Sequence, residues 1–523
     1  MKKTLLLCGA LAALGVSGAV QGAQVRNLYL AATDGYVHMP DDGAGLGNPR
    51  KVWIRGFVGD TPPGACYNSG TPAPGDFTPH PQACPKGAAL QGKATLPAPI
   101  IDVNLGDDVF VTLSNVGNLE NVAPDPHTVH LHGLKSATQN DGFNESAWAV
   151  PIGYAATYYF KAERPGSFMY HCHVEASEHV EMGMYGALII RPTQWNQNVQ
   201  GNFPSNYTPQ RNTVYGGAFN DYYDDDANGV PQEYIMLLSE IDPVWHDGVL
   251  KNFTNDKSAH LNPNTTYNKD ACKGAFELPN NQGGVSRCID LPTFNPSDFL
   301  PRYWLVNGRS YPDTLQLGGL SPDKGPAAPG AGPPIGHFPC VNQPADTCNN
   351  NFATYRTFID VRMGNKGAAP GTGPRFLIRL IGMGFTHNAH HFHGFVFTQV
   401  GEDAEPLPLW QHHPQQTLNV ASGKTYDLII APDCLAGYGL DSFASHSPGE
   451  AMVNGATSGP VGAALWDNGP PLGIVGEPVF PIGTDLSVQV WPVHSHYDYT
   501  VTNNGVYPGG ALSLIRATNT ACK

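Results

Sequence analysis

The sequence is poor in charged residues, in methionine and in long helical patterns. Only 14% of the 523 residues are charged, 9 are methionine, and the formal net charge is −15. Nucleic-acid binding needs basic surface, so this balance argues against a nucleic-acid partner. Glycine and proline are abundant instead, with 60 and 47 residues. We therefore expect short strands and turns, and an all-β fold.

Long apolar runs are missing beyond the N-terminus. Residues 5–20 form an apolar run that follows Lys2 and Lys3 and precedes small residues at 21–23. This pattern is typical of an export signal, and the run is too short and glycine-rich to persist as a membrane span. We expect residues 1–23 to be a signal peptide, with a mature protein that is periplasmic or secreted and has no membrane partner.

The ten cysteines divide into a group of eight and two others. Cys8 lies in the export signal, and Cys172 lies between two histidines. Eight cysteines in an oxidising compartment favour disulfides, whose connectivity a sequence alone does not define. Cys172 remains the odd one and is expected to have a chemical role. Nearest-neighbour pairing would give Cys66–Cys84, Cys272–Cys288, Cys340–Cys348 and Cys434–Cys522.

Alternating apolar patterns occur in two halves that repeat one plan. The histidine-rich segments at 387–400 and 493–505 resemble those at 127–133 and 171–173 of the first half. A polar stretch without periodicity separates the halves. Two β-sandwich domains explain this repeat best. The predicted boundaries are 24–197 for domain 1, 198–229 for a linker and 230–523 for domain 2, which carries long inserts at 250–295 and 435–480.

Four His-x-His pairs are the strongest chemical signal. On a strand, side chains two residues apart share a face, so each pair aims two imidazoles in one direction. Histidine is the commonest ligand of copper and zinc. One pair could arise by chance, whereas four pairs at matching places predict a metal cluster to which both halves contribute. The pairs are His130/His132, His171/His173, His391/His393 and His494/His496.

A second ligand set faces the other way. One thiolate, two imidazoles and a weak thioether make a blue-copper electron-transfer site. Met182 competes for the axial position, and core packing is the alternative role for either methionine. In the second half, Asn388 and Ser495 take the places of the first imidazole and the thiol, so only the first half can hold this site. The predicted ligands are His127, Cys172, His179 and Met184.

These motifs resemble the multicopper oxidases, the laccase-like superfamily of cupredoxin domains. Further agreement comes from GDDVFVTLSN, HLHGL, PGSFMYHCH, LVNGRSYPDTL and NNGVYPGG, and the resemblance spans nearly all of 95–518. It implies two cupredoxin-like Greek-key β-sandwich domains and four coppers. The implied reaction couples one-electron oxidation of a phenolic or aromatic compound or a metal ion to four-electron reduction of O₂ to water.

The resemblance also assigns the ligands. The type 1 copper takes the set that contains Cys172, which passes electrons onward, and the type 2 copper takes His130 and His391. A type 1 copper in the first of two domains resembles two-domain oxidases, which implies a homotrimer with the trinuclear cluster at subunit interfaces. The type 3 pair takes His132, His171, His173, His393, His494 and His496.

Several carboxylates near these motifs have two interpretations. Asp141 lies at the spacing of a family carboxylate that assists proton delivery to oxygen, and an Asp-Gly turn is the alternative. Glu175, Glu178 and Glu181 flank the predicted blue site. We expect them to form a solvated rim, with attraction of a cationic reductant or binding of a metal substrate as the alternatives. Of the remaining histidines, His246 is expected at a surface or loop position.

Two other functions compete. A copper nitrite reductase would need a single type 2 copper beside the blue site, which leaves His173, His494 and His496 unexplained. A periplasmic copper-binding or resistance protein would be expected to have methionine-rich or flexible histidine-rich segments. The scarcity of methionine and the placement of the histidines on predicted strands argue against it.

Overall fold

The computed structural model describes fourteen stretches of the chain. Within them, no helix is both long and apolar enough to cross a membrane. The stretches comprise residues 25–40, 50–60, 82–83, 88–120, 125–191, 233–255, 277–278, 287–288, 296–315, 320–321, 325–326, 359–368, 374–434 and 488–522.

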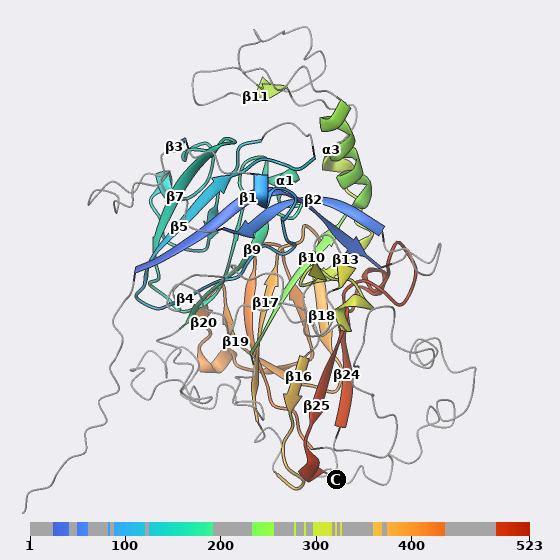
Figure 1. The fold of residues 1–523 in the computed structure, drawn as a ribbon. Helices are drawn as coiled ribbons and strands as arrows, with labels where there is room; N and C mark the ends of the chain where they lie inside the picture. The colour runs from blue at the N-terminus through green and yellow to red at the C-terminus, as the bar shows by residue number, and fades with distance from the viewer. Residues whose placement is uncertain are drawn as a thin grey trace, which may run out of the picture.

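Two sheets form the first half (Figure 1). A five-stranded sheet has the order β2-β1-β5-β7-β3, and a four-stranded sheet has the order β4-β9-β8-β6. Leu113, Leu131, Tyr158 and Phe168 are among the side chains of their shared core. The strands are β1 (Val25–Met39), β2 (Arg50–Gly59), β3 (Gln82–Ala83), β4 (Ile101–Asn104), β5 (Asp108–Asn115), β6 (His130–His132), β7 (Tyr154–Lys161), β8 (Gly166–His171) and β9 (Tyr185–Arg191).

Two larger sheets form the second half. One has the order β13-β10-β17-β23-β19-β20, with β21 beside β19, and the other has the order β16-β25-β24-β18-β22. The strands are β10 (Glu233–Ile241), β13 (Tyr303–Val306), β16 (Ile359–Arg362), β17 (Phe376–Gly382), β18 (Asn388–Phe392), β19 (Phe397–Glu402), β20 (Glu405–Pro406), β21 (Pro414–Gln415), β22 (Thr417–Val420), β23 (Thr425–Ile430), β24 (Val488–Ser495) and β25 (Leu512–Thr518). Small pairs also occur, β11 (Glu277–Leu278) with β12 (Arg287–Cys288) and β14 (Leu320–Ser321) with β15 (Gly325–Pro326).

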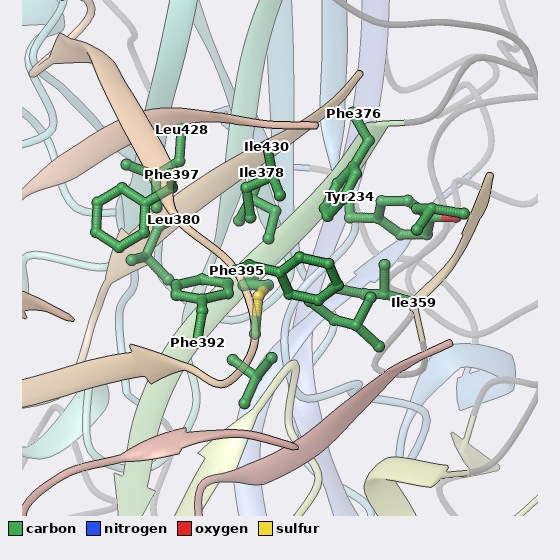
Figure 2. Packing of buried hydrophobic residues seen from close by; sticks show 14 of the residues in the cluster. Tyr234, Ile359, Phe376, Ile378, Leu380, Phe392, Phe395, Phe397, Leu428 and Ile430 are labelled. Atoms are coloured by element: carbon green, nitrogen blue, oxygen red, sulfur yellow. The ribbon is translucent and has the colours of Figure 1, made fainter. Parts of the chain in front are cut away.

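Aromatic side chains fill the core of the second half. Figure 2 shows Phe392, Phe395 and Phe397 packed against Ile378 and other aliphatic side chains of the neighbouring strands. The rings of Phe392 and Phe397 lie 5.4 Å apart in an edge-on arrangement. Each large apolar side chain buried in this way contributes about 2 kcal/mol relative to exposure. The core therefore holds rigid the strands that carry the second half's histidines.

The two halves share a buried boundary at β8. An apolar cluster joins Met169 and Tyr185 of the first half to Leu237 and Leu305 of the second half. Beside it, Ser167 Oγ donates to Asp427 Oδ1 at 2.6 Å. The strand that leads to Cys172 is thus anchored on the second half's sheet.

Charged side chains complete this boundary. Arg379 Nη1 lies 3.4 Å from Asp427 Oδ1 and donates to Ser167 Oγ at 3.1 Å, while Thr425 Oγ1 donates to the Ser167 carbonyl at 2.8 Å. The Arg379 and Asp427 side chains are only 1% and 3% exposed. A buried ion pair with its own hydrogen bonds is costly to break from one side.

Most of the expected strands are present, and the mostly-β fold with cupredoxin-like sheets is confirmed. The 97–117 segment forms β4 and β5 around a turn at Gly106, whose φ is +91°. Among the described residues at 303–315, β13 is the one strand, and a 3-10 helix follows at Asp313–Leu315. The 193–229 stretch, most of the 250–295 insert and the whole 435–480 insert lie outside the described residues.

Helix α3 (Pro243–Asn255) was not predicted, and it overlaps the start of the insert expected at 250–295. Asp242 caps it, because its Oδ1 accepts from the Val244 and Trp245 amides at 3.0 and 3.2 Å. Proline in the first turn after an aspartate is a helix-start signal. The helix packs on β2 (Figure 1), and it is an addition to the mostly-β fold.

Among the described cysteines, Cys434 and Cys522 form a disulfide with a Cα–Cα distance of 5.6 Å. This is the pair left by nearest-neighbour pairing. The other three proposed pairs involve residues outside the described part of the chain. Cys172 is a free, buried cysteine.

We expect Asp427→Asn to lower the free energy of unfolding by about 3 kcal/mol, because it removes the carboxylate charge that faces a buried guanidinium. Chemical denaturation followed by circular dichroism would measure the change. Asp108→Asn is the matched control, since Asp108 pairs with Lys161 at 3.0 Å where both side chains are more than one third exposed. The control should cost less than about 1 kcal/mol. Equal losses of unfolding free energy in the two variants would show that the buried pair stabilises the fold no more than the exposed pair does.

Candidate metal centres

A buried thiol and two imidazoles converge in the first half. Cys172 Sγ lies 3.4 Å from His179 Nδ1 and 3.9 Å from His127 Nδ1. The two rings have centroids 4.8 Å apart, and all three side chains are at most 3% exposed. Their ligand atoms lie within 4.8 Å of one another. Three convergent soft and borderline donors in a buried pocket are the donor set of a type 1 copper site.

The local chain path explains this convergence. β8 ends at His171, so Cys172 lies just beyond the last strand residue, and its amide donates to the Met184 carbonyl at 3.0 Å. Helix α1 (Ala176–His179) then turns the chain back, with Glu175 at a φ of +45° before it. The Met184 amide donates to the His179 carbonyl at 2.9 Å. The short helix therefore returns the second imidazole to the thiol.

The two candidate axial methionines point to different cores. Met184 belongs to the same buried cluster as Cys172 and Val174. Met182 packs instead with Trp53 and Trp245. The structure therefore brings Met184, and not Met182, to the thiol site, which has the type 1 pattern of His, Cys, His and Met.

The donor chemistry fits a copper ion. Thr128 N lies 3.5 Å from Cys172 Sγ as a donor, which suits a thiolate. Burial lowers the pKa of His179, but the adjacent Cys172 sulfur and the Asp125 carboxylate outweigh burial and raise that pKa to about 10. A buried site that favours positive charge on an imidazole beside a thiolate is one that a cation can occupy in place of the proton.

Four histidines of the first half form a second group, the domain 1 histidine set, on the opposite side of the same strand end. Their ring centroids lie 5.0 to 6.0 Å apart, and the rings are half-buried. His171 Nδ1 lies 2.9 Å from the Cys172 carbonyl, so it donates there and leaves Nε2 for a ligand. The set consists of His130, His132, His171 and His173.

The pKa values of two rings in this set, His171 and His132, favour the neutral form. Burial and the neighbouring rings of His130 and His132 lower the pKa of His171 to about 3. Burial and His130 also lower the pKa of His132. A neutral imidazole keeps the lone pair that a metal needs.

The second half carries the domain 2 histidine set, which matches the first. Ring centroids lie 4.8 to 5.9 Å apart, and the Nε2 atoms of His393 and His494 approach to 2.8 Å. The Nδ1 of His494 lies 2.9 Å from the Ser495 carbonyl, as in His171. Burial and the neighbouring rings lower the pKa of His393. The set consists of His391, His393, His494 and His496.

In the part of the chain that the structure describes, ring contacts join histidines within each set and none joins the two sets. His132 faces the second half, where a side-chain carbon at Gly423 would lie 3.6 Å from its Nε2. Three of the predicted pairs end beyond their strands: β8, β18 and β24 stop one or two residues before His173, His393 and His496. The alternation of faces nevertheless continues past the strand ends.

Asp141 contacts a predicted type 2 ligand. Its Oδ2 lies 3.2 Å from His130 Nδ1, and its backbone carbonyl lies 2.7 Å from the same atom. Ser136 Oγ donates to Asp141 Oδ1 at 3.0 Å, and Gly142 follows with a φ of +79°. The residue thus makes the turn and also places a carboxylate, 30% exposed, beside the histidine set.

Two expectations about the surroundings are wrong. Glu181 is not on a solvated rim: it is 5% exposed, accepts from the Asp242 amide at 2.7 Å and lies 3.7 Å from His246 Nε2. His246 is not at the surface, since it is fully buried on α3 and its Nδ1 lies 2.6 Å from the Trp53 carbonyl. Residues distant in sequence bury both groups, which a local pattern does not reveal.

The sequence interpretation also missed a charged group behind His179. Arg55 Nη1 lies 3.0 Å from His179 Nε2 and pairs with Asp125. The two residues belong to segments far from Cys172 in the chain. The sequence signal that could have found Arg55 is a charged residue within the apolar pattern of a strand, because an arginine buried there needs a partner.

Residues 81–194, which include this thiol site, match the sequence profile of the multicopper oxidases. The match covers this part of the chain and does not extend to the second half. Curated relatives include the copper-containing nitrite reductase of Neisseria meningitidis, 30% identical over 164 residues, which are 30% of this chain and 39% of that protein. The L-ascorbate oxidase of Cucurbita pepo var. melopepo is 32% identical over 114 residues, or 21% and 19% of the two chains. The matches thus span well under half of these copper proteins.

Solved structures of similar proteins cover more of the chain. The blue copper oxidase of Nitrosomonas europaea has a TM-score of 0.46 and 19% identity, covering 94% of this chain and 86% of that one. The copper nitrite reductase of the same organism has a TM-score of 0.42 and 13% identity, covering 96% and 95%.

We expect Cys172→Ser to abolish the intense blue absorption of the copper-loaded protein, because the thiolate supplies the charge-transfer band of a type 1 site. Met184→Leu should shift this absorption and keep its intensity. Met182→Leu is the matched control and should leave the spectrum unchanged. Absorption and electron paramagnetic resonance spectra of copper-loaded protein measure both effects. A blue Cys172→Ser protein would contradict the assignment.

Proposed function

We propose that the protein is a laccase-type multicopper oxidase. It would couple one-electron oxidation of a phenolic or aromatic compound, or of a metal ion, to four-electron reduction of O₂ to water. The observation that carries the proposal is the junction at Cys172. Its thiol lies in the buried site while the flanking His171 and His173 lie in the domain 1 histidine set.

Copper bound at these places would supply the redox chemistry, as one type 1, one type 2 and two type 3 ions. The chain's contribution is connection and orientation. Cys172 joins the buried site to two ligands of the histidine set through a few covalent bonds. The hydrogen bond from His171 Nδ1 to the Cys172 carbonyl fixes the orientation of a ring that would hold a copper of the cluster through Nε2.

Oxygen reduction consumes four protons for each O₂, so a proton donor is needed beside the cluster. Asp141 meets this need by position, with its carboxylate 3.2 Å from His130 Nδ1 and part of its surface exposed to solvent. We assign it the proton relay to the oxygen site.

The trinuclear cluster would form between subunits of a homotrimer. Each chain carries two four-histidine sets, and the described residues show no ring contact between them. Phe143, whose ring is 4.8 Å from that of His173, is 38% exposed, and Tyr497, next to His496 in the sequence, is also 38% exposed. Half-complete sites beside exposed aromatic residues favour assembly of one chain's first set on another chain's second set.

Export to the periplasm or beyond completes the proposal. The N-terminal pattern of residues 1–23 is its basis. The disulfide between Cys434 and Cys522 supports it, because such bonds persist in oxidising compartments.

Nitrite reduction is the second candidate, favoured by the identity of 30% to the Neisseria meningitidis enzyme. A type 1 site and one further copper would serve that reaction. The eight histidines of the two sets are more ligands than a single type 2 copper uses, which favours the oxidase.

The two functions predict different stoichiometry and acceptors. For the oxidase we expect about four coppers per chain, and oxygen uptake with a panel of phenols, aromatic amines and reduced metal ions. Metal analysis and an oxygen electrode would measure them. Two coppers per chain, together with nitrite reduction and no oxygen uptake, would transfer the assignment to the second candidate.

Subunit complementation tests the assembly. His132→Ala damages the first set and His393→Ala the second, so each variant alone should lack oxygen uptake. If clusters form between chains, mixed oligomers from co-expression will contain intact clusters and recover a fraction of the activity. Light scattering should give three times the chain mass. Absence of recovery in mixed oligomers would place the cluster within one chain.

A further inference from the structure

The far side of the His179 ring faces buried charges that the reaction described above does not use. While Nδ1 faces Cys172 Sγ, Nε2 lies 3.0 Å from Arg55 Nη1 and 3.9 Å from Asp125 Oδ2. Arg55 also pairs with Asp125, and its Nη1 lies 3.7 Å from Glu178 Oε1. Asp125, Glu178 and His179 form a second group of convergent ligand-type atoms. A charged layer therefore covers the ring edge opposite the thiol.

Hydrogen-bond chemistry assigns different roles to the two nearest groups. If Nδ1 is the copper ligand, Nε2 must carry the ring proton and needs an acceptor. A guanidinium has only donors, so Arg55 cannot accept that proton. The Asp125 carboxylate is the acceptor within reach, after a movement of under 1 Å toward hydrogen-bond distance. Arg55 then holds and neutralises the carboxylate.

Burial makes these charges strong. The side chains of Arg55 and Asp125 are 1% and 3% exposed, and that of His179 is fully buried. With little water between them and the metal site, a unit charge is felt more strongly than at the surface. A carboxylate that accepts from a ligand imidazole makes that ring a better donor to the oxidised ion, and a nearby cation opposes it.

We propose that Asp125 and Arg55 are positioning residues that set the reduction potential of the type 1 site in opposite directions. Asp125 orients His179 through Nε2–H and stabilises the oxidised state. Arg55 offsets the charge of Asp125 and stabilises the reduced state. The proposal rests on the proposed type 1 copper and is independent of the oxygen chemistry.

The test is a redox titration of the blue absorption under argon, so oxygen reduction is not needed. Asp125→Asn leaves the guanidinium charge without this carboxylate and should raise the midpoint potential. In a fixed redox buffer the ratio of reduced to oxidised copper should increase about tenfold. Adding Arg55→Gln to Asp125→Asn should return the ratio to within about threefold of the wild type, since both charges are then absent.

The return of the ratio in the double variant distinguishes an electrostatic role from structural damage. If the substitutions acted by damaging the site, the second one would move the midpoint further from the wild type. Asp107→Asn is the matched control: Asp107 is another buried carboxylate, paired with Arg26 at 2.9 Å, in the same half. It should leave the midpoint unchanged. If Asp125→Asn loads no copper, the double variant decides alone, and a ratio within threefold of wild type supports the proposal.

Two results would overturn the proposal. One is a midpoint for Asp125→Asn that equals that of Asp107→Asn. The other is a double variant whose midpoint lies further from that of the wild type than the midpoint of Asp125→Asn does. Where only the double variant loads copper, a ratio of reduced to oxidised copper more than threefold from the wild-type ratio would overturn the proposal. A shifted midpoint in a protein that does not consume O₂ would leave this inference standing and refute the oxidase. An unshifted midpoint in a protein that consumes O₂ would refute this inference and leave the oxidase standing.

Discussion

The alternation of side chains across the end of β8 is the constraint on which both candidate centres depend. Cys172 turns into the core, while His171 and His173 turn to the half-buried opposite side. The core side excludes water from a thiol site, and the other side leaves imidazoles reachable by small molecules. A shift of one residue in this strand would exchange the two faces. The register of β8 is therefore as important as its ligands, and Ser167 anchors it to Asp427 of the second half.

Both halves have the same arrangement of strands and His-x-His pairs, but they differ at two of the ligand positions. The second half has Asn388 and Ser495 where the first has an imidazole and a thiol, and both are buried. Its histidine set retains the same geometry, down to the hydrogen bond from His494 Nδ1 to the following carbonyl. The repeated plan thus places imidazoles on the half-exposed side of both halves, and places thiol and imidazole ligands on the core side of the first half alone.

Periodicity was enough to predict the strands, the two four-histidine sets and the opposite orientation of Cys172, because these depend on local alternation. The return of His179 to the thiol depends instead on helix α1. The charged layer was beyond it: Arg55 is 124 residues from His179, and only tertiary packing brings the two together. Glu181 and His246 show the same limit, since α3 buries both. Helix α3 itself could have been found from Asp242 and Pro243, but a strong β composition concealed a single helix.

The disulfide near the C-terminus has a consequence for the distant histidines. It joins Cys434, just after β23, to Cys522, just after β25, across 88 residues of sequence. Closing a loop of that length restricts the unfolded chain by an amount worth about 4 kcal/mol. Strand β25 pairs along β24, which carries His494. Reduction of this disulfide would therefore weaken the sheet that holds His494 without touching a ligand, so the redox state of the surroundings affects a metal site at a distance.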